Sequence, residues 1–200
     1  MRFAPTSFRP AFGRVLSVIM AAISVAGLAG FVVTGDWLGL ARYGWVLLLL
    51  PAATFALFWF PSLDVAEHEV TVRNVFSTVH VPWPAIERID TKYALTLYTS
   101  GGKVTAWASP APNRYASQVA ASAETRLAGK SQGGSIRPGD LLDTVSGAAA
   151  FVIRSHWEQL REDGLLDAGH ESGSVRRDIH WVTIAVLGGL LVATTLGTVL

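Results

Sequence analysis

Few residues of this 200-residue chain have the types and spacing that chemistry requires. The densest group of candidate metal ligands comprises Asp64, Glu67, His68 and Glu69. Carboxylate oxygens suit a hard divalent cation, but spacing alone is weak support for a metal. The five histidines never form a His-x-x-x-His or Glu-x-x-His pair. We therefore interpret the group as a solvated acidic connector and expect no metal.

Two further patterns are candidates for catalysis. Glu87 and Asp90 resemble an acid–base pair, yet three residues apart on an expected strand their side chains face opposite sides. Gly133-Gly134-Ser135 and Gly173-Ser174 lack the following apolar helix that a serine nucleophile needs. The absence of cysteine excludes thiol catalysis, disulfides and Cys-ligated metals. With no phosphate-binding or dinucleotide motif either, we predict no enzyme and no cofactor.

The composition indicates a membrane protein. Half of the residues are hydrophobic and only 16% are charged, against about 25% in an ordinary soluble domain. The net charge of +1 gives no support for nucleic-acid binding. Uncharged runs at 15–33, 44–60 and 181–200 are each about long enough to cross a bilayer as a helix. We predict three transmembrane helices, with residues 1–14 preceding them.

Basic residues predict the orientation. Three arginines precede the first run, only Arg42 lies in the 34–43 connection, and Arg176 and Arg177 precede the third run. The positive-inside rule then places the N-terminus and residues 61–180 in the cytoplasm, and the C-terminus outside the plasma membrane. A cleaved signal peptide is the alternative for the first run, which is longer than such segments usually are. No ionisable residue lies in any of the runs, which disfavours a transporter.

The water-facing segment begins with strands. Between residues 61 and 112, Val and Leu alternate with Thr, Arg and Tyr, which is typical of half-buried strands. Breaks fall at Asn74, at Pro82-Trp83-Pro84, near Asp90 and at Gly101-Gly102, where a tight hairpin turn needs glycine. We predict a meander of about five antiparallel strands with one apolar face that needs a cover.

Helices follow at 113–164. Asn113 begins an expected helix to Ala128, and a Gly- and Ser-rich linker follows at 129–139. A stronger amphipathic helix is predicted from about Leu142 to Asp163; its apolar face is Ala149, Ile153, Trp157 and Leu160. Gly164 closes it, and residues 165–180 form a juxtamembrane linker. The predicted class is α+β, with the helix covering the sheet.

Several segments carry a resemblance to a known family. The segments are Val70-Thr71-Val72-Arg73-Asn74, Val81-Pro82-Trp83 with Ile86, Ala106-Trp107-Ala108-Ser109-Pro110, Ile136-Arg137-Pro138-Gly139-Asp140, His156-Trp157-Glu158 and His180-Trp181. The chain resembles bacterial pleckstrin-homology-like (PH-like) domains, and is similar to actinobacterial membrane proteins of the low-molecular-weight antigen 6 type. The resemblance implies a PH-like fold and supplies no catalytic residues.

The functional hypothesis is a scaffold that binds a protein partner. Its candidate surface residues are Arg73, Asn74, Trp83 and Trp107, or an open sheet edge binds the partner. The alternative for both tryptophans is burial in the core. Small residues in the spans allow close helix packing or oligomers: Ala22, Ala26, Gly27, Gly30, Gly188, Gly189 and Ala193. Membrane-lipid sensing is the second hypothesis. It is disfavoured because the strand region contains as many acidic as basic residues, four of each, and so has no excess of positive charge.

Overall fold

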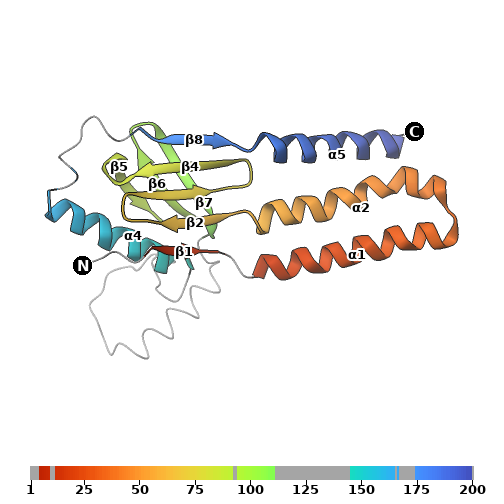
Figure 1. Ribbon diagram of the computed structural model, residues 1–200, viewed down its shortest axis with the longest axis horizontal. Coiled ribbons are helices and arrows are strands. Elements are labelled where there is room, and N and C mark those ends of the chain that lie inside the picture. The colour runs from red at the N-terminus through yellow and green to blue at the C-terminus, as the bar shows by residue number, and fades with distance from the viewer. Residues whose placement is uncertain are drawn as a thin grey trace, which may run out of the picture. The chain divides into compact units, whose positions relative to one another are not determined.

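The computed structural model describes residues 5–9, 12–91, 94–110, 145–164, 166 and 174–199. Within these residues the chain forms four α-helices and eight strands, in two compact units (Figure 1). The helical unit comprises Pro10–Pro61, Val75–Ser77 and Ile179–Leu200. The sheet unit comprises Met1–Arg9, Ser62–Asn74 and Thr78–Asp178.

Three helices of the helical unit are long and apolar enough to cross a membrane. They are α1 (Phe12–Thr34), α2 (Trp37–Phe58) and α5 (Trp181–Val199). α2 lies between the other two and packs against both (Figure 1). A helix pairs its own backbone groups, which is the condition for a chain segment in lipid. The structure thus has a helix at each of the three predicted spans, although the second begins at Trp37 rather than at Gly44.

The early start of α2 has a local cause in the turn before it. Gly35 adopts a φ of 69°, and the Asp36 carboxylate accepts a hydrogen bond of 2.8 Å from the Gly39 backbone N–H. This cap satisfies one of the free N–H groups that begin a helix, so the helix forms directly after the turn. Arg42, which the sequence placed in a connection, therefore lies inside α2. The prediction that no ionisable residue lies in a span is wrong at this position, and also at Arg14, which lies in the first turn of α1.

Small residues of α1 pack against α2. The Ser17 hydroxyl lies 3.0 Å from the Gly13 carbonyl and 3.1 Å from the Thr54 carbonyl of α2, so it can donate to either. A Cβ at Gly27 would lie 2.9 Å from a methyl carbon of Leu47. Interfaces of membrane helices are rich in small and hydroxyl residues because these allow close approach. Part of the small-residue stripe of α1 is thus used within the chain.

The sheet unit contains two sheets. The first has the strand order β1-β2-β3-β4-β8 and the second the order β5-β6-β7. The strands of the first are β1 (Thr6–Phe8), β2 (Ser62–Val65), β3 (Glu69–Arg73), β4 (Ser77–Pro82) and β8 (Arg176–Ile179). Those of the second are β5 (Ile86–Asp90), β6 (Ala94–Thr99) and β7 (Gly102–Pro110). A single 3₁₀ turn, Trp83–Ala85, connects β4 to β5 and so leads from one sheet to the other.

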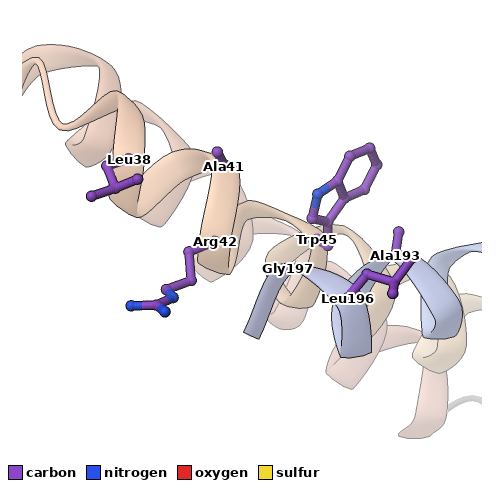
Figure 2. Close-up of a pocket in the computed structure, with 7 residues that line it drawn as sticks. All are labelled: Leu38, Ala41, Arg42, Trp45, Ala193, Leu196 and Gly197. Carbon is purple, nitrogen blue, oxygen red and sulfur yellow. The ribbon is translucent and has the colours of Figure 1, made fainter. Parts of the chain in front are cut away.

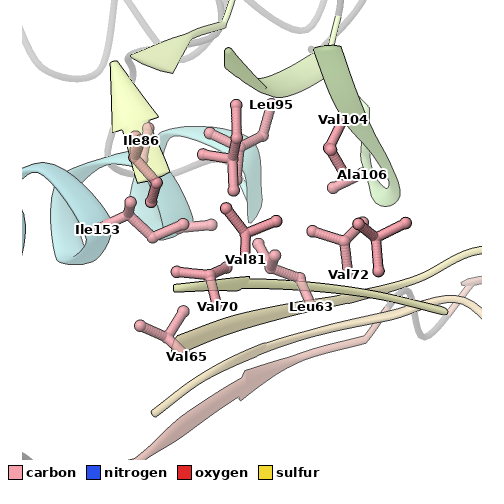
Figure 3. Packing of buried hydrophobic residues seen from close by; sticks show 14 of the residues in the cluster. Leu63, Val65, Val70, Val72, Val81, Ile86, Leu95, Val104, Ala106 and Ile153 are labelled. Carbon is pink, nitrogen blue, oxygen red and sulfur yellow. The ribbon is translucent and has the colours of Figure 1, made fainter. Parts of the chain in front are cut away.

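Alternate residues of both sheets fill one core (Figure 3). Val70 and Val72 of β3 are fully buried, whereas Thr71 between them is not, as the period of two requires. Helix α4 (Val145–Glu162) adds Ala149 and Ile153 to the same core. Trp157 and Leu160 pack against it more loosely, and Gly164 follows the helix with a φ of 68°. The α+β class and the covering helix are confirmed.

The number of strands differs from the predicted number. The described residues hold eight strands, and β1, β2 and β8 have no counterpart among the five predicted. β8 reads Arg-Arg-Asp-Ile and all four residues are exposed, so no apolar alternation marks it. β1 is only three residues long and precedes the first span in the sequence. It pairs with β2. The predicted helix at 113–128 and linker at 129–139 lie outside the described residues.

The β6–β7 hairpin yields a first test of local structure. Thr99 pairs with Gly102 across the loop Ser100-Gly101, and Gly102 has a φ of 118°. Among the described residues, a Cβ at Gly102 would meet no atom within 4 Å, so its substitution strains the backbone. We expect Gly102→Ala to destabilise the sheet unit by about 1–2 kcal/mol. Gly101→Ala is the matched control, since Gly101 has no positive φ and is exposed.

Hydrogen exchange of the β6 and β7 amides in the full chain measures this difference. We expect faster exchange in Gly102→Ala than in Gly101→Ala. Equal exchange in the two variants would contradict the role given to the backbone of Gly102.

Candidate interaction surface at strands β3 and β7

Two of the four predicted surface residues, Asn74 and Trp107, are joined by a hydrogen bond, and a third, Arg73, directly precedes Asn74. Arg73 is exposed at the end of β3, Asn74 follows it, and Trp107 lies on β7 with 49% of its surface exposed. The side chain of Asn74 joins the two strands, because it bonds to the backbone of β7. We call Arg73, Asn74 and Trp107 the Trp107 surface.

The Asn74 side chain satisfies two backbone groups of β7. Its amide nitrogen donates to the Thr105 carbonyl at 2.9 Å, and its amide oxygen accepts from the Trp107 N–H at 2.9 Å. β7 is the last strand of its sheet and has a strand partner, β6, on one side only. Backbone groups on the outer edge of such a strand have no ladder partner. Asn74 bonds two of them, and so fixes the backbone that carries Trp107.

Trp83 does not belong to this surface. It is 2% exposed, and its indole N–H donates to the Ala66 carbonyl at 3.1 Å. Its ring meets the His156 ring of α4 edge to face, with centroids 4.8 Å apart. Because Trp83 begins the 3₁₀ turn between the two sheets, its side chain enters the core. The interpretation of Trp83 as a surface residue is wrong, and the core alternative holds.

The acidic residues singled out in the sequence are used in hydrogen bonds. Asp64 lies on β2 and accepts from Ser7 and Ser62. Glu69 lies on β3 and contacts His80. Asp64 and Glu69 are therefore parts of strands rather than of a connector. Glu67 and His68 are exposed between β2 and β3. Across the described residues, no group of three or more His, Asp or Glu side chains is placed to hold a metal.

The catalytic candidates do not converge on a site. The Asp90 carboxylate accepts a hydrogen bond of 2.8 Å from the Thr91 N–H, while Glu87 is exposed on the same strand. Ser174 is exposed, and Gly133-Gly134-Ser135 and Gly173 lie outside the described residues. Asp90 is therefore bound into the local backbone rather than paired with Glu87.

His80 of β4 contacts residues of β3 and β8 in the first sheet, an interaction that the sequence did not suggest. The His80 Nδ1 lies 2.8 Å from a Glu69 oxygen on β3, and its Nε2 lies 3.6 Å from an Asp178 oxygen on β8. Arg176 donates to the same Asp178 oxygen at 2.9 Å. These side chains are partly exposed, and exposed ion pairs contribute only about 0–1 kcal/mol each. We infer that these contacts help to hold β8 against β4.

One basic residue of the strands is held by its own sheet. The Arg88 guanidinium lies over the Tyr98 ring, 4.1 Å from its centroid, and so stacks on its own sheet. Arg73 lies on the first sheet and Lys103 on β7 of the second. Lys92 is outside the described residues.

Comparison with known proteins identifies the sheet segment. Residues 60–134 match the family of the bacterial PH domain. No curated protein and no solved structure matched the chain. The match confirms the resemblance to bacterial PH-like domains. It does not extend to the narrower resemblance to actinobacterial proteins of antigen 6 type, which stays a prediction.

Proposed function

We propose that this protein, which carries both a match to the bacterial PH domain at residues 60–134 and three apolar helices, is a non-enzymatic scaffold that binds a protein partner. The binding site is the Trp107 surface. The observation that carries this proposal is a half-exposed tryptophan on a strand whose backbone is fixed by Asn74. Tryptophan and arginine are the residues most enriched in the energetic centres of interfaces.

The mode of binding follows from the backbone of β7. The Trp107 N–H already donates to Asn74, so it is not free to pair with an added strand. The partner therefore contacts the Trp107 ring and the Arg73 guanidinium rather than extending the sheet at this point. A fixed backbone lowers the entropic cost of ordering an interface, which favours affinity.

The proposed orientation keeps the scaffold in the cytoplasm. The arginines before α1 and the pair Arg176 and Arg177 before α5 favour this side, by the positive-inside rule. The membrane is then the plasma membrane, and the Gly35-Asp36 turn faces outside. Oligomers through the spans are part of the proposal, because a Cβ at Gly30, Gly188 or Gly189 would meet no atom within 4 Å from the other described parts of the chain.

A photo-crosslinking residue placed at position 107 tests the proposal in native membranes. We expect adducts with a cytoplasmic protein, and we expect Trp107→Ala to lower recovery of that partner about tenfold or more, as for a binding hot spot. Phe151 is the matched control, because it is a 58% exposed aromatic residue of the same unit. Phe151→Ala should leave recovery unchanged.

Two results would contradict the proposal. Equal loss of the partner in both variants would show that Trp107 has no special part in binding. A partner that resides outside the cytoplasm would contradict the orientation.

Membrane-lipid sensing is the second candidate function, and one observation favours it. In the helical unit, His180 before α5 donates its backbone N–H to the Phe76 carbonyl at 2.9 Å, and the Phe76 side chain is 45% exposed. Aromatic side chains at the end of a span suit the interface of a bilayer. Lipid adducts at position 107, in place of protein adducts, would favour this function.

A further inference from the structure

Arg42 is the one residue of the three apolar helices whose charge lies well inside a helix, in the part of the chain that the structure describes. It lies five residues after Trp37, the first residue of α2, which at about 1.5 Å per residue is roughly 8 Å along the helix. An isolated charge at this depth is costly unless the side chain reaches the headgroups or finds a partner. An ionisable residue in such a place calls for a functional explanation.

Arg42 has no such partner within the described residues. Its side chain takes part in no hydrogen bond, ion pair or ring contact there. The acidic residue nearest in sequence, Asp36, accepts from the Gly39 N–H and so serves as the cap of α2. The N–H groups of the guanidinium are therefore available to a ligand from outside the chain. Its planar fork of donors matches a phosphate or carboxylate group.

An apolar groove begins beside Arg42 (Figure 2). It has a volume of about 490 Å³, and it lies between α2 and α5. Its other lining residues are Leu38, Ala41, Trp45, Ala193, Leu196 and Gly197. Arg42 supplies its only charged group. This volume falls within the usual range for small-ligand sites, about 300–1,000 Å³.

Gly197 sets the shape of this groove. A Cβ there would lie 2.9 Å from the Arg42 carbonyl oxygen, so only glycine allows α5 to approach α2 this closely. Ala193, one turn earlier on α5, lines the groove with a small side chain. The two small residues keep the helices in contact and leave room for an apolar chain.

We propose that this groove is a binding site for one membrane phospholipid. The lipid phosphodiester accepts hydrogen bonds from the Arg42 guanidinium, and an acyl chain lies along the groove against Leu38, Trp45 and Ala193. The charge of the arginine selects an anionic group, and the apolar lining selects a group attached to a hydrocarbon chain. This site is at the Gly35-Asp36 end of the helices, and it does not depend on the proposed partner of the Trp107 surface.

Native mass spectrometry of the purified full chain, with added phosphatidylglycerol, tests the site. We expect one tightly held lipid per chain, and a loss of affinity of about tenfold or more in Arg42→Gln, as expected when a charge-assisted hydrogen bond is removed. Arg177→Gln is the matched control, since it removes the same charge from an exposed position on β8. It should bind as the unmodified chain does.

Two further measurements keep the proposal testable if Arg42→Gln fails to fold. Ala193→Leu fills the groove without a change of charge and should also weaken binding. A galactolipid with the same acyl chains and no phosphate should bind the unmodified chain about tenfold less tightly. Equal binding of the two lipids, unchanged binding in Arg42→Gln, or an Arg42-dependent dimer without bound lipid would overturn the proposal.

Discussion

Replacing Trp83 by alanine is expected to destabilise the sheet unit by about 3–5 kcal/mol. The side chain is among the largest that the core buries completely, and its removal leaves a cavity between the two sheets and α4. The Ala66 carbonyl also loses its indole donor. A domain of this size has a total stability of about 5–15 kcal/mol, so the loss is a large fraction of it.

Hydrogen exchange and limited proteolysis of the full chain in nanodiscs measure this loss. We expect the strand amides of Trp83→Ala to exchange much faster, and the chain to be cut within the sheet unit while the three apolar helices stay protected. Trp107→Ala is the matched control, because it removes the same side chain from a half-exposed position and should change stability far less. A similar loss in both variants would contradict the assignment of Trp83 to the core.

Replacing Asn74 by alanine is expected to destabilise the sheet unit by about 1–3 kcal/mol. The change removes two hydrogen bonds, to the Thr105 carbonyl and from the Trp107 N–H. Each such bond contributes about 0.5–1.5 kcal/mol net, because water reaches these partly exposed groups once Asn74 is gone. Asn74→Asp should restore only part of this loss, since a carboxylate still accepts from Trp107 but cannot donate to Thr105.

The same exchange measurement resolves where the loss occurs. We expect the amide of Trp107 to show the largest local change, together with faster exchange throughout β7. Arg73→Ala is the control, because Arg73 precedes Asn74 and is exposed. Its stability should stay within about 0.5 kcal/mol of the unmodified chain. If Arg73→Ala is as unstable as Asn74→Ala, the hydrogen bonds of Asn74 do not hold β7.

The candidate site could be predicted only in part. The sequence indicated that the tryptophans are either core or surface residues, and burial then separated Trp83 from Trp107. The local sequence does not show which tryptophan is buried. Trp83 lies between two prolines and Trp107 lies in an alternating strand, and either position allows burial or exposure. Asn74 bonds to Thr105 and Trp107, which follow it in the chain by 31 and 33 positions. No local sequence pattern predicts contacts over such a separation.

The structure also changed the interpretation of Arg42. In the sequence it follows a Gly-Asp pair and precedes a longer apolar run, which suggested a connection between spans. Capping by Asp36 starts α2 at once, so the arginine lies within the helix beside α5. The groove between these helices depends on Gly197, which is 155 residues after Arg42 in the chain.

The sequence by itself determined the properties that depend on local pattern. Runs of about 20 apolar residues specify helices long enough to cross a membrane, period-two alternation specifies β3, β4, β6 and β7, and the period of α4 specifies its buried face, because each pattern matches the geometry of one element. Tertiary structure alone decided which segments complete the sheet and which side chains meet. β1 and β8 form through pairing with β2 and β4, since a short strand is stable only beside a partner. The Trp107 surface and the Arg42 groove exist for the same reason: each is made by elements distant in sequence that packing brings into contact.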